Sequence, residues 1–210
     1  MMKKGFTLSE LLMALTVVGV IIAIMAPMVV THFRSKSQVA ALQSAYTAII
    51  SGIKLIQVEE KAGSLKKTSL YYTDGSNITN TSGAFLKKYF NVSKDCETEP
   101  GDCFAPSYKN IEKEEIYMPE NVYCVQLSTG ASICLTPPGY KDLSARVYVD
   151  INGPARPNVA GRDYFLFYIY SDGFVGDRAN YSDGVNSCRE NEYGSGCFNR
   201  IVDADWVMDY

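Results

Sequence analysis

An uninterrupted apolar run near the start of the chain constrains its fold more than any other feature. Leu11 to Val30 are twenty residues without a charged side chain. A helix of this length spans about 30 Å, which is enough to cross one bilayer. A secretory signal peptide has a shorter apolar core, and Pro27 directly after Ala26 makes a poor cleavage site. We therefore expect a single helix that lies in a membrane or in a comparably apolar environment.

The residues just before this run form a second pattern. Two lysines and Gly5 precede Phe6, and Glu10 lies at the mouth of the run. An ionisable side chain inside a membrane segment is costly unless it is paired, so Glu10 requires a partner or access to the lipid headgroups. A plain membrane anchor explains neither the Gly5-Phe6 pair nor Glu10.

The stretch from Lys3 to Lys36 resembles the N-terminal signal of type IV pilins and of type II secretion pseudopilins. The resemblance implies that a prepilin peptidase removes residues 1–5 by cutting after Gly5 and then N-methylates Phe6. It also implies that residues 6–31 form a transmembrane helix that becomes the core of a filament.

The resemblance also implies a role for Glu10 in assembly. Cleavage would turn the Phe6 backbone nitrogen into a cationic amine, and Glu10 of one subunit could meet the Phe6 amine of its neighbour in the apolar core. Two buried charges that neutralise each other would favour the correct register. The alternative is that Glu10 reaches the headgroups near the cytoplasmic face, which we expect in the free, membrane-inserted subunit.

The helical pattern continues beyond the apolar run. Apolar residues recur at spacings of three and four, which predicts an amphipathic continuation over residues 32–62: Val39, Leu42, Tyr46, Ile49, Ile53 and Ile56. Gly63 is the expected C-cap. Helices of the resembled family commonly carry a glycine and a proline where this chain has Gly19 and Pro27, and we expect a bend at Pro27, whose ring removes a backbone hydrogen bond.

Residues 63–210 predict a globular, β-rich head. A short helix is expected over Ala84 to Phe90, followed by strands at Val122–Ser128, Ala131–Leu135, around Val147–Ile151 and at Tyr164–Tyr170. Ile201 to Tyr210 could form an edge strand or a short helix. The fold class is therefore α+β: a pilin-like antiparallel sheet laid against the long helix, with the many tyrosines at half-buried positions and on a wet outer surface.

Six cysteines lie in the head and none in the helix: Cys96, Cys103, Cys124, Cys134, Cys188 and Cys197. They indicate disulfides in an oxidising compartment, and nearest-neighbour pairing is the simplest of the fifteen possible connectivities. The second pair needs a bulge or a loop wider than a tight turn at Thr129-Gly130. Zinc is disfavoured because no C-x-x-C pair occurs and the single histidine, His32, borders the apolar run.

The leader lysines and the cysteines together predict the orientation. Lys3 and Lys4 favour a cytoplasmic N-terminus, although Arg34 and Lys36 weaken the bias. The cysteines favour a periplasmic or extracellular head. We expect a protein that crosses the inner (cytoplasmic) membrane once, before it enters a filament.

A segment rich in Asx and Gly residues offers a candidate metal site. Asp150, Asn152 and Asp163 supply the hard oxygens that calcium prefers, and the segment also looks like one found in many pseudopilin-like proteins, some of which bind calcium nearby. Capped turns use the same residues, and no closing bidentate glutamate is present. Calcium is thus one possible cofactor, and a structural loop is the alternative.

The sequence lacks enzyme motifs, so we expect no catalysis and no small-molecule substrate. It contains no phosphate loop, no H-E-x-x-H and no G-x-S-x-G. Asp203, Asp205 and Asp209 are interleaved with apolar residues and predict a solvated face. The net charge of −3 becomes more negative when the leader is lost, which disfavours nucleic acid as a partner.

Three functions stay open on the sequence. The first is a pseudopilin or minor pilin of a type II secretion system, which would interact with prepilin peptidase, other pilin or pseudopilin subunits and an inner-membrane assembly platform. The second is a subunit of a type IV pilus or of a competence (DNA-uptake) pilus. The third is a membrane-anchored extracytoplasmic binding domain. We favour the first.

Overall fold

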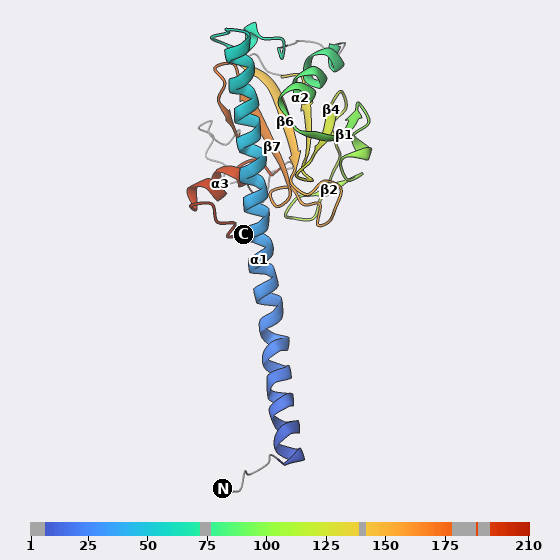
Figure 1. Cartoon of the computed structure of the whole chain (residues 1–210), viewed down its shortest axis with the longest axis vertical. Coiled ribbons are helices and arrows are strands. Elements are labelled where there is room, and N and C mark those ends of the chain that lie inside the picture. Colours follow the sequence, from blue (N-terminus) through green and yellow to red (C-terminus); the bar gives the residue numbers. More distant parts are fainter. Residues whose placement is uncertain (1–6, 72–76, 139–141, 178–187, 189–193) are drawn as a thin grey trace. The chain divides into compact units, whose positions relative to one another are not determined.

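The computed structural model describes residues 7–71, 77–138, 142–177, 188 and 194–210. The chain divides into two compact units, Met1–Ser37 and Gln38–Tyr210. Helix α1 (Leu8–Glu59) forms the described part of the first unit and the first helix of the second, which we call the globular unit (Figure 1). The predicted long helix is confirmed. Gly19 and Pro27 lie inside α1, and the bend at Pro27 stays a prediction.

Within the globular unit, α1 buries one stripe of side chains at helical spacing: Val39, Leu42, Ala45, Ile49, Gly52, Ile53 and Ile56. This stripe matches the prediction except at Tyr46, which is half-buried. The Tyr46 hydroxyl donates to the backbone oxygen of Val175 at 2.9 Å, so the ring packs on the core while its polar end is satisfied.

The predicted C-cap at Gly63 is wrong, because the helix ends earlier. Lys61 takes the left-handed conformation with φ 51°. The amide of Ala62 then donates to the carbonyl of Gln57 at 2.9 Å, which satisfies one of the last carbonyls of the helix.

Short helical segments connect α1 to the sheet. They are the 3₁₀ turn η1 (Leu65–Lys67), the π-helical turn η3 (Thr79–Gly83) and helix α2 (Ala84–Tyr89). Helix α2 confirms the short helix expected over Ala84 to Phe90.

The described strands form a six-stranded antiparallel sheet in the order β1-β4-β5-β6-β7-β8. Their bounds are Val92–Glu97 for β1, Tyr123–Leu127 for β4, Ser132–Thr136 for β5, Leu143–Asp150 for β6, Tyr164–Tyr170 for β7 and Val175–Gly176 for β8. The predicted hairpin is β4–β5, and the alternating segments that follow it are β6 and β7. These elements confirm the α+β class.

One face of the sheet packs against the stripe of α1. Alternate residues of the central strands, such as Val125, Ile133, Val147 and Phe167, belong to the same buried cluster as that stripe. Side chains of successive strand residues point to opposite faces, so the register leaves the intervening residues for the other side of the sheet.

The other face is also buried, which the predicted wet outer surface did not anticipate. The 3₁₀ turn η4 (Pro100–Asp102) and the small β2–β3 sheet (Tyr108–Lys109 and Glu115–Ile116) belong to the segment that supplies this cover. Phe104, Tyr108 and Ile116 form a second cluster with Tyr148 and Tyr164 from β6 and β7. The rings of Tyr108 and Tyr164 stack with centroids 4.3 Å apart.

All six cysteines are paired as neighbours along the chain: Cys96–Cys103, Cys124–Cys134 and Cys188–Cys197. Cys124 and Cys134 lie directly opposite each other on β4 and β5. The loop between these strands is wider than a two-residue turn, because the amide of Leu127 donates to the carbonyl of Ala131 at 2.7 Å. Gly130 accommodates this loop with φ 91°.

The C-terminal segment contains helix α3 (Cys197–Asp203), so the expected helix, and not the expected edge strand, is present. Phe198 packs against Tyr46 of α1, with ring centroids 4.7 Å apart, and against Phe167 of β7. Helix α3 therefore sits beside the start of the globular half of α1.

Candidate functional site

The N-terminus of α1 is built as a capping box. The backbone N–H and the hydroxyl of Thr7 both donate to Oε2 of Glu10 at 2.8 Å. In return, the amide of Glu10 donates to the Thr7 hydroxyl at 3.3 Å. This reciprocal arrangement satisfies amides that the first turn of a helix leaves without partners, and the carboxylate complements the positive end of the helix dipole.

Glu10 keeps part of its bonding capacity after these contacts. Both bonds from Thr7 end on Oε2, and Oε1 has no bonding partner among the residues that the structure describes. The side chain is exposed. Glu10 can therefore remain the helix cap and accept a further donor. The predicted cleavage and methylation residues, Gly5 and Phe6, lie outside the described residues.

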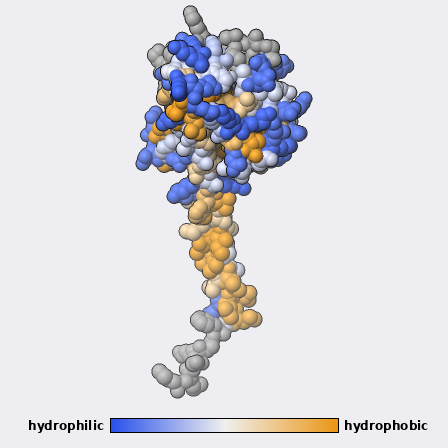
Figure 2. All heavy atoms as spheres, turned by 45° about the horizontal axis from the view of Figure 1, so that its top comes forward, coloured by the Kyte–Doolittle hydropathy of each residue, from blue (hydrophilic) through white to orange (hydrophobic). Residues whose placement is uncertain are grey.

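The helix behind this cap is apolar and uncovered. In the described chain, α1 is the one helix long and apolar enough to cross a membrane. Figure 2 shows this part of α1 as a hydrophobic surface. Most of its large apolar side chains, including Leu12, Ile22 and Met28, are more than half exposed in the single chain. Such a surface requires lipid or other protein around it.

Of the predicted calcium residues, Asp150 and Asp163 already accept hydrogen bonds, whereas the buried Oδ1 of Asn152 has no partner among the described residues. Asp150 accepts the hydroxyl of Tyr108 at 2.5 Å and the amide of Asn152 at 3.1 Å. Asp163 accepts the amides of Asn158 and Val159 at 2.7 and 2.6 Å. No group of three or more His, Cys, Asp or Glu side chains suited to a metal occurs among the described residues. The two carboxylates therefore bond to protein groups of the loop and of Tyr108, which supports the structural-loop alternative.

Burial determines the electrostatics of this loop. Both Asp150 and Asp163 have no exposed surface. Burial raises the pKa of Asp150 to about 7, and the negative charge of Asp163 adds to the rise, although the bonds from Tyr108 and Asn152 oppose it. Burial also raises the pKa of Asp163. Tyr108, which donates to Asp150, has a raised pKa for the same reason and stays protonated.

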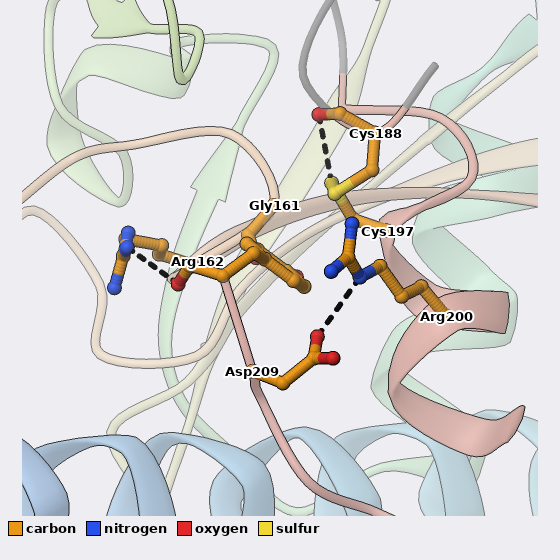
Figure 3. A network of polar contacts seen from close by, with 7 residues as sticks. Gly161, Arg162, Cys188, Cys197, Arg200 and Asp209 are labelled. Carbon is orange, nitrogen blue, oxygen red and sulfur yellow. Dashed lines mark hydrogen bonds and ion pairs between the residues drawn. A yellow bond between two sulfur atoms is a disulfide. The ribbon is translucent and has the colours of Figure 1, made fainter. Parts of the chain in front are cut away.

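The same loop holds the C-terminal segment (Figure 3). Gly161 has φ 83°, and a Cβ there would lie 2.4 Å from Sγ of Cys197. Arg162 donates to the backbone oxygen of Tyr210 at 2.6 Å, and the Tyr210 hydroxyl donates to the carbonyl of Gly161. Arg200 of α3 donates to Asp209 at 2.8 Å. The segment from Asp150 to Asp163 thus joins the cover of the sheet to the C-terminus.

Two of these contributions were missed by the sequence analysis. Thr7 was not identified, although Thr7-Leu8-Ser9-Glu10 matches the S/T-x-x-E pattern of a capping box and could have been found. Tyr108 was not identified either, because it lies in a segment without regular periodicity and its partner Asp150 is 42 residues away.

Comparison with known proteins gives one finding. Residues 1–26 match the family model described as the prokaryotic N-terminal methylation motif. Searches of curated proteins and of solved structures gave no significant match. The motif implies processing by prepilin peptidase and assembly with other pilins, and with the exposed apolar helix it fits a membrane-anchored protein with a globular domain. The chain therefore carries the prepilin-type signal of type IV pilins and pseudopilins.

Proposed function

We propose that this chain is a structural subunit of a type IV pilus-like filament, cut after Gly5 and methylated on Phe6 by prepilin peptidase. The observation that carries the proposal is the first turn of α1, where an exposed carboxylate caps a helix with an uncovered apolar surface. That surface supports burial in lipid before assembly and among neighbouring helices afterwards.

Glu10 is suited to both states. Cleavage after Gly5 leaves the amide of Thr7 intact, so the capping box would persist in the mature chain. Thr7 then reduces the cost of holding Glu10 near the membrane, and Oε1, which no described residue contacts, accepts the Phe6 amine of a neighbouring subunit when the helices pack. The pair neutralises two charges that would each be costly alone in the apolar core.

Within this class we propose a pseudopilin or minor pilin of a type II secretion system. The acidic net charge disfavours the alternative of a DNA-uptake subunit. The globular unit extends well beyond α1, and three disulfides staple it, which suits a specialised subunit in an oxidising compartment. Its neighbours would be other pseudopilins and the inner-membrane assembly platform, with the globular unit on the periplasmic side.

The first experiment is mass spectrometry of the mature N-terminus in cells with active prepilin peptidase. We expect a chain that begins at Phe6 and carries one methyl group on its amine. A chain that retains Lys3, Lys4 and Gly5 under these conditions would rule the proposal out.

Glu10→Gln separates the two roles of Glu10. Glutamine is accepted at this position of a capping box, so the cap should persist, but the charge that would pair with the Phe6 amine is lost. We expect normal insertion and cleavage of both Glu10→Gln and Glu10→Val, and a reduced yield of filaments in the sheared fraction. Wild-type yield from Glu10→Gln would show that the carboxylate charge has no part in assembly.

A further inference from the structure

Two surface patches on the globular unit combine exposed aliphatic side chains with charged side chains that form no ion pair with the described residues. The first, which we call the helix-end patch, consists of Lys54, Leu55 and Val58, which lie on the exposed side of α1, and Lys61, which follows its end. The second, the α3 patch, consists of Val202, Asp203, Asp205 and Val207 at the end of α3 and just after it.

The helix-end patch is apolar and cationic. Leu55 and Val58 are 53% and 76% exposed, although they lie within three residues of the buried Ile56. Lys54 and Lys61 are exposed, and their side chains make no ion pair or hydrogen bond with any described residue.

The acidic neighbours of this patch are already neutralised or bonded. Glu59 pairs with Lys88 and accepts the hydroxyl of Tyr89. Glu60 accepts the amide of Ser69 at 2.8 Å. Glu60 keeps its negative charge, since its partners are neutral groups of Ser69, whereas Lys54 and Lys61 are cations that pair with no described residue.

The α3 patch has the opposite charge. Val202 and Val207 are 38% and 54% exposed. Asp203 and Asp205 are exposed, and within the described chain neither carboxylate has a partner. The nearby cation, Arg200, is already bonded to Asp209, so the unpaired charges here are negative.

Backbone conformation contributes to the exposure of the α3 patch. Asp205 and Trp206 take left-handed conformations in succession, with φ 55° and 60°. Such a conformation is uncommon for a bulky residue. It places the Trp206 ring against Phe198, with centroids 5.9 Å apart, while Asp205 and Val207 stay at the surface.

The two patches lie at opposite ends of the globular unit. Helix α3 meets α1 at Tyr46 through Phe198. Lys54 and Val58 come eight and twelve residues after Tyr46 in the same helix, which places them about 12 and 18 Å farther along the helix axis, and Lys61 follows the end of the helix. Figure 1 shows α3 beside the start of the globular half of α1, while α1 ends at the opposite end of the globular unit. One copy of the chain cannot bring these patches together.

We infer that the helix-end patch of one copy of this chain docks on the α3 patch of the next copy in the filament. Each patch offers two aliphatic side chains and two unpaired charges, and the signs of the charges are complementary. A contact between two different surfaces is heterologous, and repetition of such a contact without closure produces a helical filament. The inference rests on the proposed function and adds to it the surface by which the globular units recognise one another.

Charge reversal tests the contact in the full-length chain, with prepilin peptidase present and filaments collected by shearing. Lys54→Asp with Lys61→Asp places like charges opposite one another. Asp203→Lys with Asp205→Asn reverses the other patch, and asparagine at position 205 keeps the left-handed conformation accessible. We expect each double variant to lower the filament yield at least about tenfold, and the combination of all four changes to restore most of it.

Matched controls carry the same changes of charge elsewhere. Lys109→Asp with Lys113→Asp and Glu112→Lys with Glu120→Gln alter exposed residues in and near the β2–β3 sheet that belong to neither patch. These controls should assemble like the wild type. Oxidation state on non-reducing gels and thermal unfolding in detergent report whether each variant has folded.

The possible outcomes distinguish a failure of this inference from a failure of the proposed function. If wild-type filaments form and a folded double variant assembles normally, the contact is wrong while the filament function stands. If both double variants are impaired but the fourfold variant is not restored, the two patches do not meet, and the inference is again overturned. Absence of filaments from the wild-type chain would instead refute the proposed function itself.

Discussion

At the scale of single residues, Asp150 connects two layers of the globular unit. It ends β6, accepts the hydroxyl of Tyr108 at 2.5 Å and so anchors the segment that covers the outer face of the sheet. The Tyr108 hydroxyl in turn accepts the amide of Ala105 at 3.0 Å. A buried carboxylate without such donors would be strongly destabilising, so these bonds offset part of the cost of burial.

The raised pKa of Asp150 predicts how stability depends on pH. The native carboxyl has a pKa of about 7, above its ordinary value of 3.8, so between these values the native state binds more protons than the unfolded state. Stability should therefore fall as pH rises from about 4 to 7, by about 2–4 kcal/mol, and Asp163, whose pKa burial also raises, should contribute in the same direction.

Denaturant unfolding of the detergent-solubilised chain at several pH values measures this dependence. Asp150→Asn removes the titrating group and should flatten the profile, at some cost in overall stability because asparagine offers one acceptor oxygen where aspartate offers two. Asp142→Asn is the matched control, since Asp142 is exposed. An unchanged profile in the Asp150 variant would mean that this carboxyl does not govern the pH response.

At the scale of elements, α1 has two different environments within one helix. Its first half is apolar on all sides and exposed, whereas its second half buries a single stripe against the sheet. The sheet itself is buried on both faces, by α1 on one side and by the segment around β2 and β3 on the other. The middle strands therefore contribute side chains to both buried clusters.

A pair of alanine substitutions on α1 tests which face of the helix contributes to the stability of the fold. Ile53 is 1% exposed and Leu55 is 53% exposed, two residues apart on the same helix. Ile53→Ala should lower the free energy of unfolding by about 2–5 kcal/mol, because it leaves a cavity in the core. Leu55→Ala should change it by less than about 0.5 kcal/mol.

Thermal or denaturant unfolding of the two variants is the measurement. Because Leu55 belongs to the helix-end patch, its variant should still assemble less well than the wild type. Equal losses of stability in the two variants would contradict the assignment of the buried stripe.

At the scale of the whole molecule, local sequence patterns predicted the helices and strands. The contacts between residues far apart in the chain could not be predicted from the sequence. The period of the apolar residues in α1 and the alternation in β7 are strong signals, and both elements formed where expected. The cover over the outer face comes from a segment without period, held by bonds such as Tyr108 to Asp150. Its burial of Tyr148 and Tyr164 therefore could not be foreseen.

In the candidate site, too, the sequence indicated individual residues but not their contacts. The position of Glu10 at the mouth of the apolar run indicated its importance, whereas its partner Thr7 belongs to a local capping pattern that was not among the predictions. Asp150 and Asp163 were identified as hard ligands, yet the fold uses their oxygens to cap turns and to hold Tyr108. Residue type alone does not distinguish these uses, because both need the same acceptor oxygens.

Two of the disulfides lie in different parts of the globular unit, and this difference predicts separate consequences for stability and for assembly. Cys124–Cys134 joins two central strands, and Cys188–Cys197 closes onto the start of α3. The bridges span similar lengths of chain, with separations of 10 and 9 residues, so the chain-entropy model gives each about 2–3 kcal/mol.

Replacing either pair by alanine should therefore lower the melting temperature by a similar amount, but the local effects should differ. Loss of Cys188–Cys197 should increase amide hydrogen exchange mainly in α3 and around Trp206, where the α3 patch lies, and should reduce filament yield out of proportion to the loss of stability. Loss of Cys124–Cys134 should instead increase exchange in β4 and β5 and leave the α3 patch intact. Equal filament yields from the two variants at matched stability would indicate that the orientation of α3 has no influence on assembly, and that the contact between globular units lies on another surface.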